Sequence, residues 1–404
     1  MRSSGAMTQA SGRPVLAIFI DGLGADAIER MPFLARQRTV RRMRTELGYS
    51  ITCHASMYTG LRPDRHGLWF VWQRRPESSP FRWLRPLRFL DAIDNLPMRV
   101  VATKVTRRFV RTTSWFGLPY PVHARWRDMP DLDIAERKLW TDPGYLAPAA
   151  TIFDRMRADG VPFEIVGMQR GGAVGLAAIE AWRRPPTSSR FTYLFAGDVD
   201  HASHAHGQGS GEVTDLLARF DREIERRVDE FAREGVEPIL VVWSDHGHHD
   251  VRRLNPLTFL KERGIDLGRY AHVIDTNFIR FWVEDPDERR RLAGDLDGLG
   301  IGHVLTESEL DAYRVKMRDD RYGNVIFYVE LPYALSHTIW GFGRHLASGH
   351  GYLPEHPGSD AAFVSNLPAR DGQLELVDVA PSLLELLGLR IDRDLDGRSV
   401  WSDR

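Results

Sequence analysis

Residues 15–22 read VLAIFIDG, six consecutive apolar residues followed by an aspartate and a glycine. A short apolar run that ends at turn-forming residues is typical of a strand covered on both faces. Four later stretches have the same character. They are FEIVGM (163–168), FTYLFAGD (191–198), PILVVWSD (238–245) and AAFVSN (361–366).

Helical patterns lie between these runs. The clearest covers 212–234, where apolar residues recur every three or four positions with charged residues between them, and it ends at Gly235. Similar patterns cover 25–37, 148–159, 287–299 and 379–387. Strands that alternate with helices of this length predict an α/β fold with a mostly parallel central sheet and helices on both faces.

Length and composition indicate an ordinary globular chain. The 404 residues include 54 Lys and Arg, 55 Asp and Glu, and 43% hydrophobic residues, with a net charge of −1. These values exclude wholesale disorder, a collagen-like repeat and a disulfide scaffold. The length predicts two to three domains, or one large α/β domain with an insertion.

The chain shows no sign of a membrane segment or a secretory leader. No apolar stretch approaches the ~18 residues of a membrane helix, and residues 1–14, which we expect to be flexible, lack the apolar core of a signal peptide. The single cysteine, Cys53, has no intramolecular partner for a disulfide. We therefore expect a cytoplasmic location.

One segment differs from the rest in charge. Residues 71–127 hold twelve basic and three acidic residues, a local charge of +9, together with many aromatic residues. We interpret 68–147 as a cap inserted into an α/β core made of 15–67 and 148–404. The basic segment suits a polyanionic ligand or an anionic membrane surface, or a solvated face that pairs with acids elsewhere.

Residues that commonly bind metals follow several of the predicted strands. The first strand ends at Asp21, and 238–245 runs into SDHGHHD, which presents Asp245 and His246 side by side. The strand 191–198 runs into GDVDHASHAHG, in which Asp200 and His204 are four residues apart. Near the C-terminus, ASGHGY places His350 between two glycines. Loops that follow strands in open α/β sheets converge at one edge, where ligands bind.

Each of these motifs is weak alone, but together they point to metal chemistry. A mixed set of carboxylates and imidazoles suits Zn²⁺ or Mn²⁺ better than Ca²⁺, which prefers oxygen ligands. The segment GYSITCHASMYTG (48–60) adds candidate hydroxyl nucleophiles.

The order of these motifs resembles the alkaline phosphatase superfamily, and within it the type I phosphodiesterase/nucleotide pyrophosphatase family. The resemblance runs from IDG through SITCHASMYTGLRPDRHG, D-x-x-x-H, SDHG and GHGY to the closing VDVAPSLLELLGLRIDRDLDGRSV. It covers nearly the whole chain, and the predicted cap matches least. It implies an alkaline-phosphatase-like core and a metal-dependent hydrolase of phosphate esters.

The resemblance also implies roles for individual residues. The nucleophile position falls on Ser50. One metal would be held by Asp200, His204 and His350, and the other by Asp21, Asp245, His246 and the Ser50 oxygen. Five further residues near these motifs are interpreted as neighbours rather than ligands, with His206 and His249 as the first reserves. They are Asp198, His201, His206, His248 and His249.

The sequence departs from the family at one point. Nucleotide pyrophosphatases carry a phosphate-binding Asn shortly after the nucleophile segment, where this chain has Val71. Gln73, a backbone N–H or a cap residue such as Lys104 is the candidate replacement. This difference weakens the inference to nucleotide substrates.

The implied mechanism uses two divalent ions, Zn²⁺ first and Mn²⁺ second. Ser50 attacks phosphorus to form a phosphoseryl intermediate, which metal-bound water then hydrolyses. Thr52 is the competing nucleophile. Cys53 is better interpreted as a small buried residue.

Other classes of protein fit the sequence less well. A sulfatase needs a C/S-x-P-x-R motif, which neither Cys53 nor Ser50 begins, and the G-x-S-x-G pattern of serine hydrolases lacks its second glycine. A non-catalytic metal- or phosphate-binding protein would be expected to lose a ligand position, and none is missing.

The ester type and the partners are open at the level of sequence. We expect cleavage of a phosphodiester or pyrophosphate, with a phosphomonoesterase or a phosphomutase as the alternatives. The segment FRWLRPLRFL (81–90) either covers the core or contacts a lipid or lipid-linked headgroup. Nucleic acid is not expected as a partner, because no nucleic-acid-binding motif appears.

Overall fold

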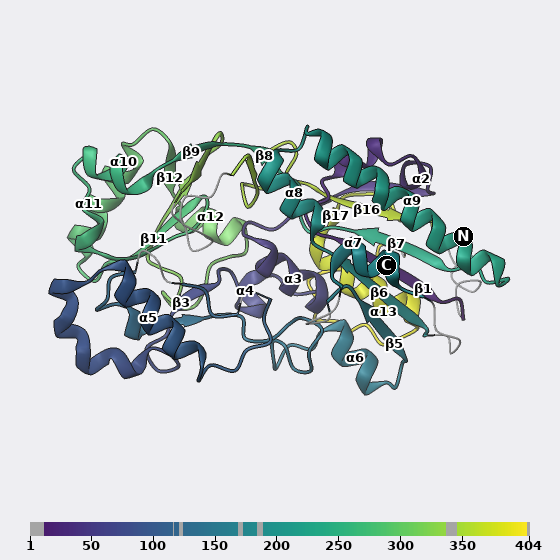
Figure 1. Ribbon diagram of the computed structural model, residues 1–404, viewed down its shortest axis with the longest axis horizontal. Coiled ribbons are helices and arrows are strands. Elements are labelled where there is room, and N and C mark those ends of the chain that lie inside the picture. The colour runs from purple at the N-terminus through teal and green to yellow at the C-terminus, as the bar shows by residue number, and fades with distance from the viewer. Residues whose placement is uncertain are drawn as a thin grey trace. The chain divides into compact units, whose positions relative to one another are not determined.

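The computed structural model describes residues 12–115, 117–120, 124–168, 173–183, 189–336 and 346–401 (Figure 1). The chain divides into two compact units. The first comprises Met1–His66, Trp140–Asp250 and Ala347–Arg404, and the second comprises Gly67–Leu139 and Val251–Leu346. Most of the segment predicted as a cap is thus grouped with a later stretch of the chain, and its description as a separate insertion stays a prediction. Most of the N-terminal segment 1–14 lies outside the described residues.

A seven-stranded sheet forms the centre of the first unit, in the order β17-β2-β16-β7-β1-β6-β5. Its strands are β1 (Val15–Ile20), β2 (Thr39–Arg44), β5 (Phe163–Val166), β6 (Phe191–Ala196), β7 (Ile239–Trp243), β16 (Ala361–Ser365) and β17 (Leu374–Glu375). Strand β1 pairs in parallel with both β6 and β7, whereas β16 is antiparallel to its neighbours β7 and β2. The predicted mostly parallel α/β sheet is confirmed.

The five predicted strands are all members of this sheet. Their side chains alternate between two packed faces, which explains why the apolar runs are continuous. On one face, Leu16 and Ile18 share a core cluster with Leu217 of α9 (Gly211–Arg233). On the other face, the Phe19 ring lies 5.2 Å from the His54 ring of α3 (Ser50–Thr59).

The remaining helices of the first unit surround this sheet (Figure 1). They are η1 (Ala25–Arg30), α2 (Pro32–Ala35), α4 (Pro63–His66), α6 (Ile152–Ala158), α7 (Gly175–Ala181), α8 (Asp198–His206), η5 (Leu376–Asp378) and α13 (Val379–Leu387). Strands β8 (His249–Asp250) and β15 (Ser348–Gly349) pair with each other in a small antiparallel sheet, which completes the unit.

Two predicted helices differ from the structure at their ends. The pattern over 25–37 is divided into η1 and α2, because Pro32 has no N–H to continue a helix from the preceding turn. The pattern over 148–159 begins only at Ile152, where Thr151 and Asp154 form a capping box.

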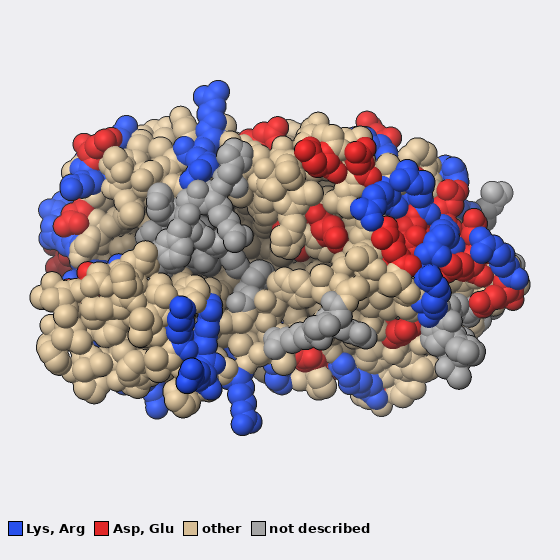
Figure 2. Space-filling view, in the orientation of Figure 1, with Lys and Arg blue, Asp and Glu red and all other residues tan. Residues whose placement is uncertain are grey.

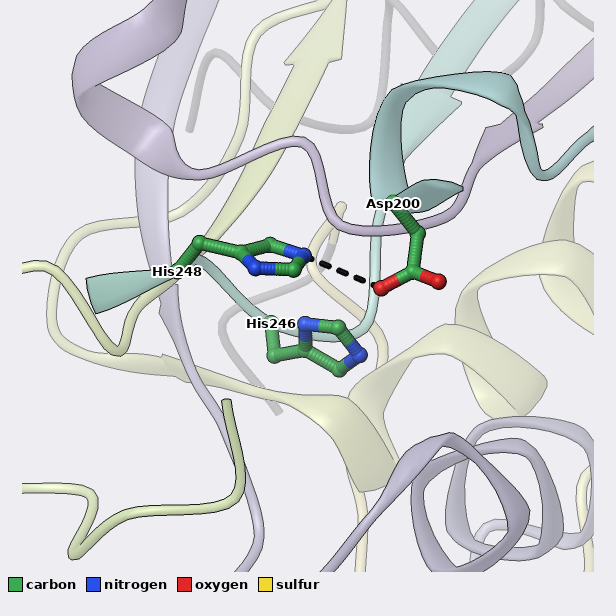
Figure 3. A group of neighbouring side chains, drawn as sticks. All are labelled: Asp200, His246 and His248. Carbon is green, nitrogen blue, oxygen red and sulfur yellow. Dashed lines mark hydrogen bonds and ion pairs between the residues drawn. The ribbon is translucent and has the colours of Figure 1, made fainter. Parts of the chain in front are cut away.

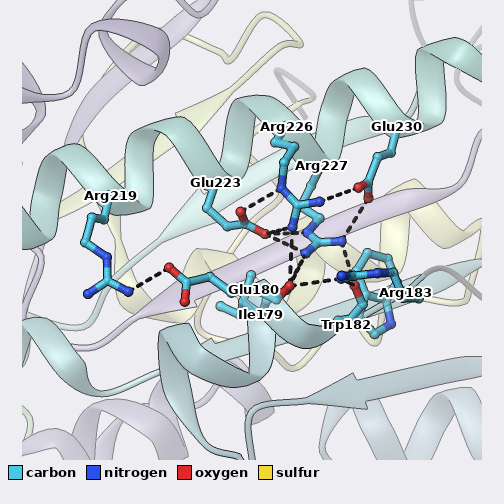
Figure 4. Close-up of polar contacts among 9 residues, drawn as sticks. All are labelled: Ile179, Glu180, Trp182, Arg183, Arg219, Glu223, Arg226, Arg227 and Glu230. Carbon is cyan, nitrogen blue, oxygen red and sulfur yellow. Dashed lines mark hydrogen bonds and ion pairs between the residues drawn. The ribbon is translucent and has the colours of Figure 1, made fainter.

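A buried arginine joins α9 to α7 (Figure 4). The fully buried Arg227 donates to the carbonyl oxygens of Ile179 and Trp182 and pairs with Glu223 on its own helix. Toward solvent, acidic and basic side chains are interspersed over α9 (Figure 2). Arg227 tolerates burial because each nitrogen of its guanidinium group donates to a carbonyl or carboxylate oxygen.

The second unit contains a four-stranded antiparallel sheet in the order β10-β11-β13-β12. These strands are β10 (Ala271–Ile274), β11 (Phe278–Trp282), β12 (Gly302–Val304) and β13 (Val325–Val329). Two short pairs accompany it, β3 (Trp72–Arg74) with β4 (Leu132–Ile134) and β9 (Arg252–Leu254) with β14 (Tyr333–Leu335). Its helices are η2 (Arg82–Ile93), α5 (Leu96–Arg107), η3 (Met129–Asp131), α10 (Pro256–Glu262), η4 (Leu267–Arg269), α11 (Pro286–Asp297) and α12 (Glu307–Ala312). Among the described residues, no helix has the length and apolar character needed to span a bilayer.

Candidate metal centre

The candidate ligands come from loops and helix starts at one edge of the seven-stranded sheet. Asp21 directly follows β1, and Asp245 and His246 follow β7. Asp200 and His204 lie one turn apart on α8. The backbone joins these elements, because the Asp200 N–H donates to the Asp21 carbonyl oxygen at 3.1 Å. The adjacency of β1, β6 and β7 therefore explains why motifs far apart in sequence meet here.

The structure brings the seven predicted residues together as two groups. In one group, the ligand atoms of Asp21, Asp245 and His246 lie within 4.8 Å of one another. In the other, those of Asp200, His204 and His350 do. The rings of His246 and His350 stack at 3.7 Å, so the two groups are in contact.

Ser50 is the first residue of α3 and faces the first group. Its Oγ lies 3.1 Å from His246 Nε2, which is also 3.1 Å from Asp245 Oδ2 and 3.6 Å from Asp21 Oδ1. The Ser50 side chain is at a helix N-terminus, where the backbone carries partial positive charge. The competing nucleophile Thr52 is fully buried within the same helix, whereas Ser50 keeps 9% of its surface exposed.

Three buried carboxyl groups, those of Asp21, Asp200 and Asp245, lie close together at the site. Burial and the nearby carboxylates of Asp245 and Asp200 raise the pKa of Asp21 well above its ordinary value. Burial also disfavours charge on Asp245 and Asp200, but the adjacent imidazoles of His246 and His204 outweigh burial and lower the pKa of both acids. Three carboxylates this close and this buried repel one another unless positive charge lies between them.

Several buried polar atoms of the site form no hydrogen bond with any residue that the structure describes. They include Asp21 Oδ1, Asp245 Oδ2 and His350 Nδ1. Buried polar atoms are almost always paired in folded proteins, so an orphaned pair of carboxylate oxygens marks a place for a ligand. The donor set of carboxylate oxygen and imidazole nitrogen fits divalent metal ions of the zinc and manganese type.

Ser348 and the backbone fix the orientation of the imidazoles. His204 Nδ1 lies 2.8 Å from the Ser348 carbonyl oxygen, and His246 Nδ1 lies 3.1 Å from that of Gly247. A carbonyl oxygen can only accept, so each Nδ1 carries a proton, and each ring in its neutral form presents its Nε2 lone pair to the carboxylates. This is the arrangement typical of histidines that bind metals.

The four histidines that the sequence predicted as neighbours of the ligands differ in where their side chains lie. His201 bonds back to the Gly197 carbonyl, and His206 is largely exposed beside Glu212, 3.9 Å away. His249, the other reserve, contacts Ser359 Oγ. His248, in contrast, is buried inside the site, and its Nε2 lies 2.9 Å from Asp200 Oδ1 (Figure 3). His248 and His249 are adjacent in sequence, and no hydrophobic pattern around them predicts which side chain is buried. Only the folded loop shows that it is His248.

Other predicted residues have structural roles or lie elsewhere. Asp198 accepts the Leu176 N–H at 2.9 Å at the start of α7. Cys53 is fully buried, and burial raises the pKa of its thiol well above the ordinary value, which argues against a nucleophilic thiolate. Gln73, on β3, and Lys104, exposed on α5, belong to the second unit, and their contact with phosphate stays a prediction.

Comparison with known proteins identifies the family. Residues 15–344 match the family model described as type I phosphodiesterase / nucleotide pyrophosphatase. The chain therefore belongs to this family and is a hydrolase of phosphate esters, of the phosphodiesterase/pyrophosphatase type. Metal-dependent chemistry is the family's mode of action, and the clusters above are its candidate sites in this chain. Comparison with curated proteins returned no match.

Solved structures with the same fold include two ectonucleotide pyrophosphatases. Human ectonucleotide pyrophosphatase/phosphodiesterase 5 aligns with a TM-score of 0.66 and 13% identity, covering 95% of this chain and 97% of its own. The murine protein aligns with a TM-score of 0.63 and 14% identity, covering 94% and 96%. An inactive threonine-to-alanine variant of the murine protein in complex with AMP gives 0.63 and 15%, covering 94% and 96%. These likenesses confirm the alkaline-phosphatase-like fold.

Proposed function

We propose that this protein cleaves a phosphodiester or pyrophosphate with two divalent metal ions, through a phosphoseryl intermediate on Ser50. The observation that carries this proposal is the position of Ser50 Oγ, 3.1 Å from His246 Nε2 and at the N-terminus of α3. A serine hydroxyl against a cluster of metal-type ligands is suited to attack a phosphate held by the same cluster.

The two groups of residues would hold one ion each. Asp21, Asp245 and His246, with the Ser50 oxygen, would hold the first, and Asp200, His204 and His350 the second. When bound, such ions lower the pKa of a coordinated hydroxyl and neutralise charge on phosphate oxygens. We propose Zn²⁺ as the resident metal and Mn²⁺ as the alternative, because imidazole and carboxylate suit both.

The chain's own residues then account for the chemistry at Ser50. The bond from Ser50 Oγ to phosphorus forms as the bond from phosphorus to the leaving oxygen breaks. The serine proton passes to water, and the leaving oxygen takes a proton from water. Backbone N–H groups of the first turn of α3 favour the negative phosphate. Water then cleaves the seryl ester, which releases the phosphate product and restores the hydroxyl.

The preference for diesters or pyrophosphates rests on the family, and on the complex of the murine relative with AMP. Gln73 and Lys104 are proposed as additional phosphate contacts in place of the family's asparagine. A panel of p-nitrophenyl phosphate mono- and diesters, assayed on metal-reconstituted protein, tests the ester type. Faster cleavage of diesters supports the proposal. A strong preference for the monoester assigns the chain as a phosphomonoesterase, and phosphate transfer within a substrate without release assigns it as a phosphomutase.

Replacement of the nucleophile is the direct test of Ser50. Ser50→Ala removes the attacking oxygen but leaves the six other ligands, so we expect turnover to fall by at least about 10⁴-fold while metal content, measured by elemental analysis, is retained. Thr52→Val is the matched control, because it removes a hydroxyl from the same helix and should keep most of the activity. Activity retained by Ser50→Ala and lost by Thr52→Val would assign the nucleophile to Thr52. A chain that binds both metals but hydrolyses no ester would be a non-catalytic binding protein.

A further inference from the structure

Ser348 determines which nitrogen of His248 carries a proton. Ser348 Oγ lies 2.7 Å from the Ser203 carbonyl oxygen, which can only accept, so the one hydroxyl proton is directed there. The same Oγ lies 3.1 Å from His248 Nδ1 and must therefore accept a hydrogen bond from it. In the neutral ring, a proton on Nδ1 leaves a lone pair on Nε2.

That lone pair is directed at a carboxylate oxygen (Figure 3). His248 Nε2 is 2.9 Å from Asp200 Oδ1, and the imidazole is fully buried. Two acceptors at this distance repel each other unless a cation lies beside both of them.

The same Asp200 oxygen is the meeting point of two predicted ligands. His204 Nε2 lies 3.3 Å and His350 Nε2 lies 3.6 Å from Asp200 Oδ1. The single residue Ser348 orients two of the three rings, His204 through its carbonyl oxygen and His248 through its hydroxyl. His248 thus has the same hydrogen-bonding pattern as the histidines assigned as ligands.

The ligand atoms of Asp200, His246 and His248 lie within 4.8 Å of one another, as do those of Asp200, His204 and His350, so the two groups share Asp200. We propose that His248, through Nε2, is an additional protein ligand of the cation at Asp200, beside His204 and His350. Three imidazoles and one carboxylate make a nitrogen-rich, four-coordinate site of the kind that zinc-like divalent ions occupy. The Asp21–Asp245–His246 site has one imidazole. The Asp200 site should therefore bind its ion more tightly and fill first. This inference rests on the proposed function only in assuming a bound cation, and its test measures binding rather than catalysis.

Two substitutions separate a ligand from a hydrogen-bond partner. In His248→Gln the side-chain amide can still donate to Asp200 but is a poor metal ligand, and His248→Ala removes both interactions. Zn²⁺ affinity is measured on demetallated protein by competition with a chromogenic chelator. We expect both variants to lose at least about 100-fold in affinity at the tighter site. His201→Gln, an exposed histidine beside Asp200 that bonds back to its own helix, is the matched control and should bind as the wild type does.

Wild-type protein supplies a readout that does not depend on any variant folding. With one equivalent of Zn²⁺ bound, X-ray absorption fine structure should show three imidazoles at the metal. Two imidazoles, or wild-type affinity in His248→Gln, would overturn the inference and make His248 a positioning residue for Asp200. Loss of affinity in a chain that hydrolyses no phosphate ester would leave the ligand assignment intact and refute the proposed function alone.

A second inference concerns the surface formed by η2 and α5 in the second unit, which we call the η2–α5 surface. From the sequence, residues 81–90 either cover the core or contact lipid. In the structure, some apolar side chains of this segment are buried and others are exposed. Phe81 and Leu84 are fully buried, whereas Trp83 is 45% and Phe89 is 73% exposed. Trp83 Nε1 donates to Thr106 Oγ1 at 3.0 Å, which places η2 alongside α5.

Helix α5 and the residues after it continue the exposed apolar surface. Val101 and Val105 are four residues apart on α5 and are 59% and 41% exposed, so they share one side of the helix. Phe109, two residues beyond the end of α5, is 79% exposed. Ala102 and Thr106 on the other side are buried. On the viewed face the area over η2 and α5 is largely free of charge, and basic side chains border it (Figure 2).

The cations of this surface favour one kind of partner. Lys104, Arg108 and Arg111 are exposed and form no ion pair with any described residue. Exposed aromatic and aliphatic side chains interspersed with unpaired bases are complementary to an anionic bilayer, where apolar groups insert and cations contact headgroups. We infer that the η2–α5 surface binds anionic lipid membranes.

Co-sedimentation with vesicles tests this inference on the full chain. Wild-type protein should bind vesicles of phosphatidylcholine mixed with phosphatidylserine, and binding should weaken as salt is raised. The double variant Phe89→Ser/Phe109→Ser should bind at least about tenfold more weakly. Leu257→Ser, which removes an exposed apolar side chain from α10, should bind as the wild type does. Absence of wild-type binding, or equal binding by the double variant, would overturn it.

Discussion

At the scale of single residues, Glu46 is a buried carboxyl group that the proposed chemistry does not use. It is 5% exposed and lies 3.5 Å from Arg62, whose closer partner is Glu375 at 2.6 Å. Burial, only partly offset by Arg62, raises the pKa of Glu46 from 4.5 to about 7. The folded protein therefore holds a proton that the unfolded chain releases between these two pH values.

This shift predicts how stability depends on pH. Because the folded pKa is raised, Glu46 reduces the free energy of unfolding as pH rises from about 4.5 to about 7, by on the order of 3 kcal/mol in all. Glu46→Gln removes this titration, so its stability relative to wild type should be greater at pH 8 than at pH 5. Urea unfolding at both pH values measures the difference. Glu237→Gln, which removes an exposed carboxylate paired with Arg13, is the control, and an equal pH effect in both variants would contradict the assignment.

Sequence patterns identified most of the residues that meet at the site but not how they are oriented. Asp21, Asp200 and Asp245 each follow a predicted strand closely in sequence. Because a parallel sheet brings the carboxyl ends of its strands to one edge, the sequence alone predicted that these three residues lie close together. Their roles in binding and catalysis stay predictions. The inward turn of His248 was not foreseeable, because it depends on Ser348, one hundred residues further along the chain.

At the scale of elements, the loop after β7 depends on a glycine. A Cβ on Gly247 would lie 2.0 Å from the Gly358 carbonyl oxygen, and its N–H donates to the Ser359 carbonyl at 2.9 Å. Gly247→Ala must therefore push apart two backbone segments, one of which carries His246 and His248.

We expect Gly247→Ala to lose about 2 kcal/mol of stability and to bind metal more weakly at both groups of ligands. Thermal unfolding and the chelator competition measure the two effects. Gly209→Ala is the matched control, because a Cβ there meets nothing within 4 Å. Wild-type metal affinity in Gly247→Ala would show that the loop tolerates displacement.

The elements of the first sheet were predictable because both faces are packed, which makes each strand an unbroken apolar run. The strands of the second sheet were harder to find. In β11 the run FIRFW is interrupted by Arg280, which is fully buried and paired with Asp275 at 2.7 Å. A charged residue inside an apolar run makes a core strand look like a surface segment, because the sequence does not show that the charge is paired in the core.

At the scale of the whole molecule, the metal ions should stabilise the fold. The candidate ligands come from β1, α8, the β7 loop and the segment after β15, so a bound cation joins parts of the chain that would otherwise repel one another. Ligands that bind only the folded state raise its stability in proportion to the logarithm of their concentration. Removing the metals with a chelator should lower the melting temperature by about 5 °C, and Zn²⁺ or Mn²⁺ should restore it. An unchanged melting temperature would contradict metal binding at the buried carboxylates.

The predicted cytoplasmic location and the proposed lipid contact are based on different kinds of observation. The location stays a prediction from the sequence. The lipid contact rests on side chains that the fold exposes, which composition cannot reveal: the same aromatic-rich segment contributes both Phe81 to the core and Phe89 to the surface.

The central claim is that Ser50 becomes covalently attached to phosphorus during turnover. Metal-loaded enzyme is mixed with a chromogenic phosphodiester, quenched in acid within the first turnovers and digested, and the peptide containing residues 50 and 52 is fragmented by mass spectrometry. We expect a phosphate-ester adduct on Ser50 that requires metal and is absent from Ser50→Ala. Rapid turnover with no adduct on this peptide, or an adduct on Thr52, would contradict it.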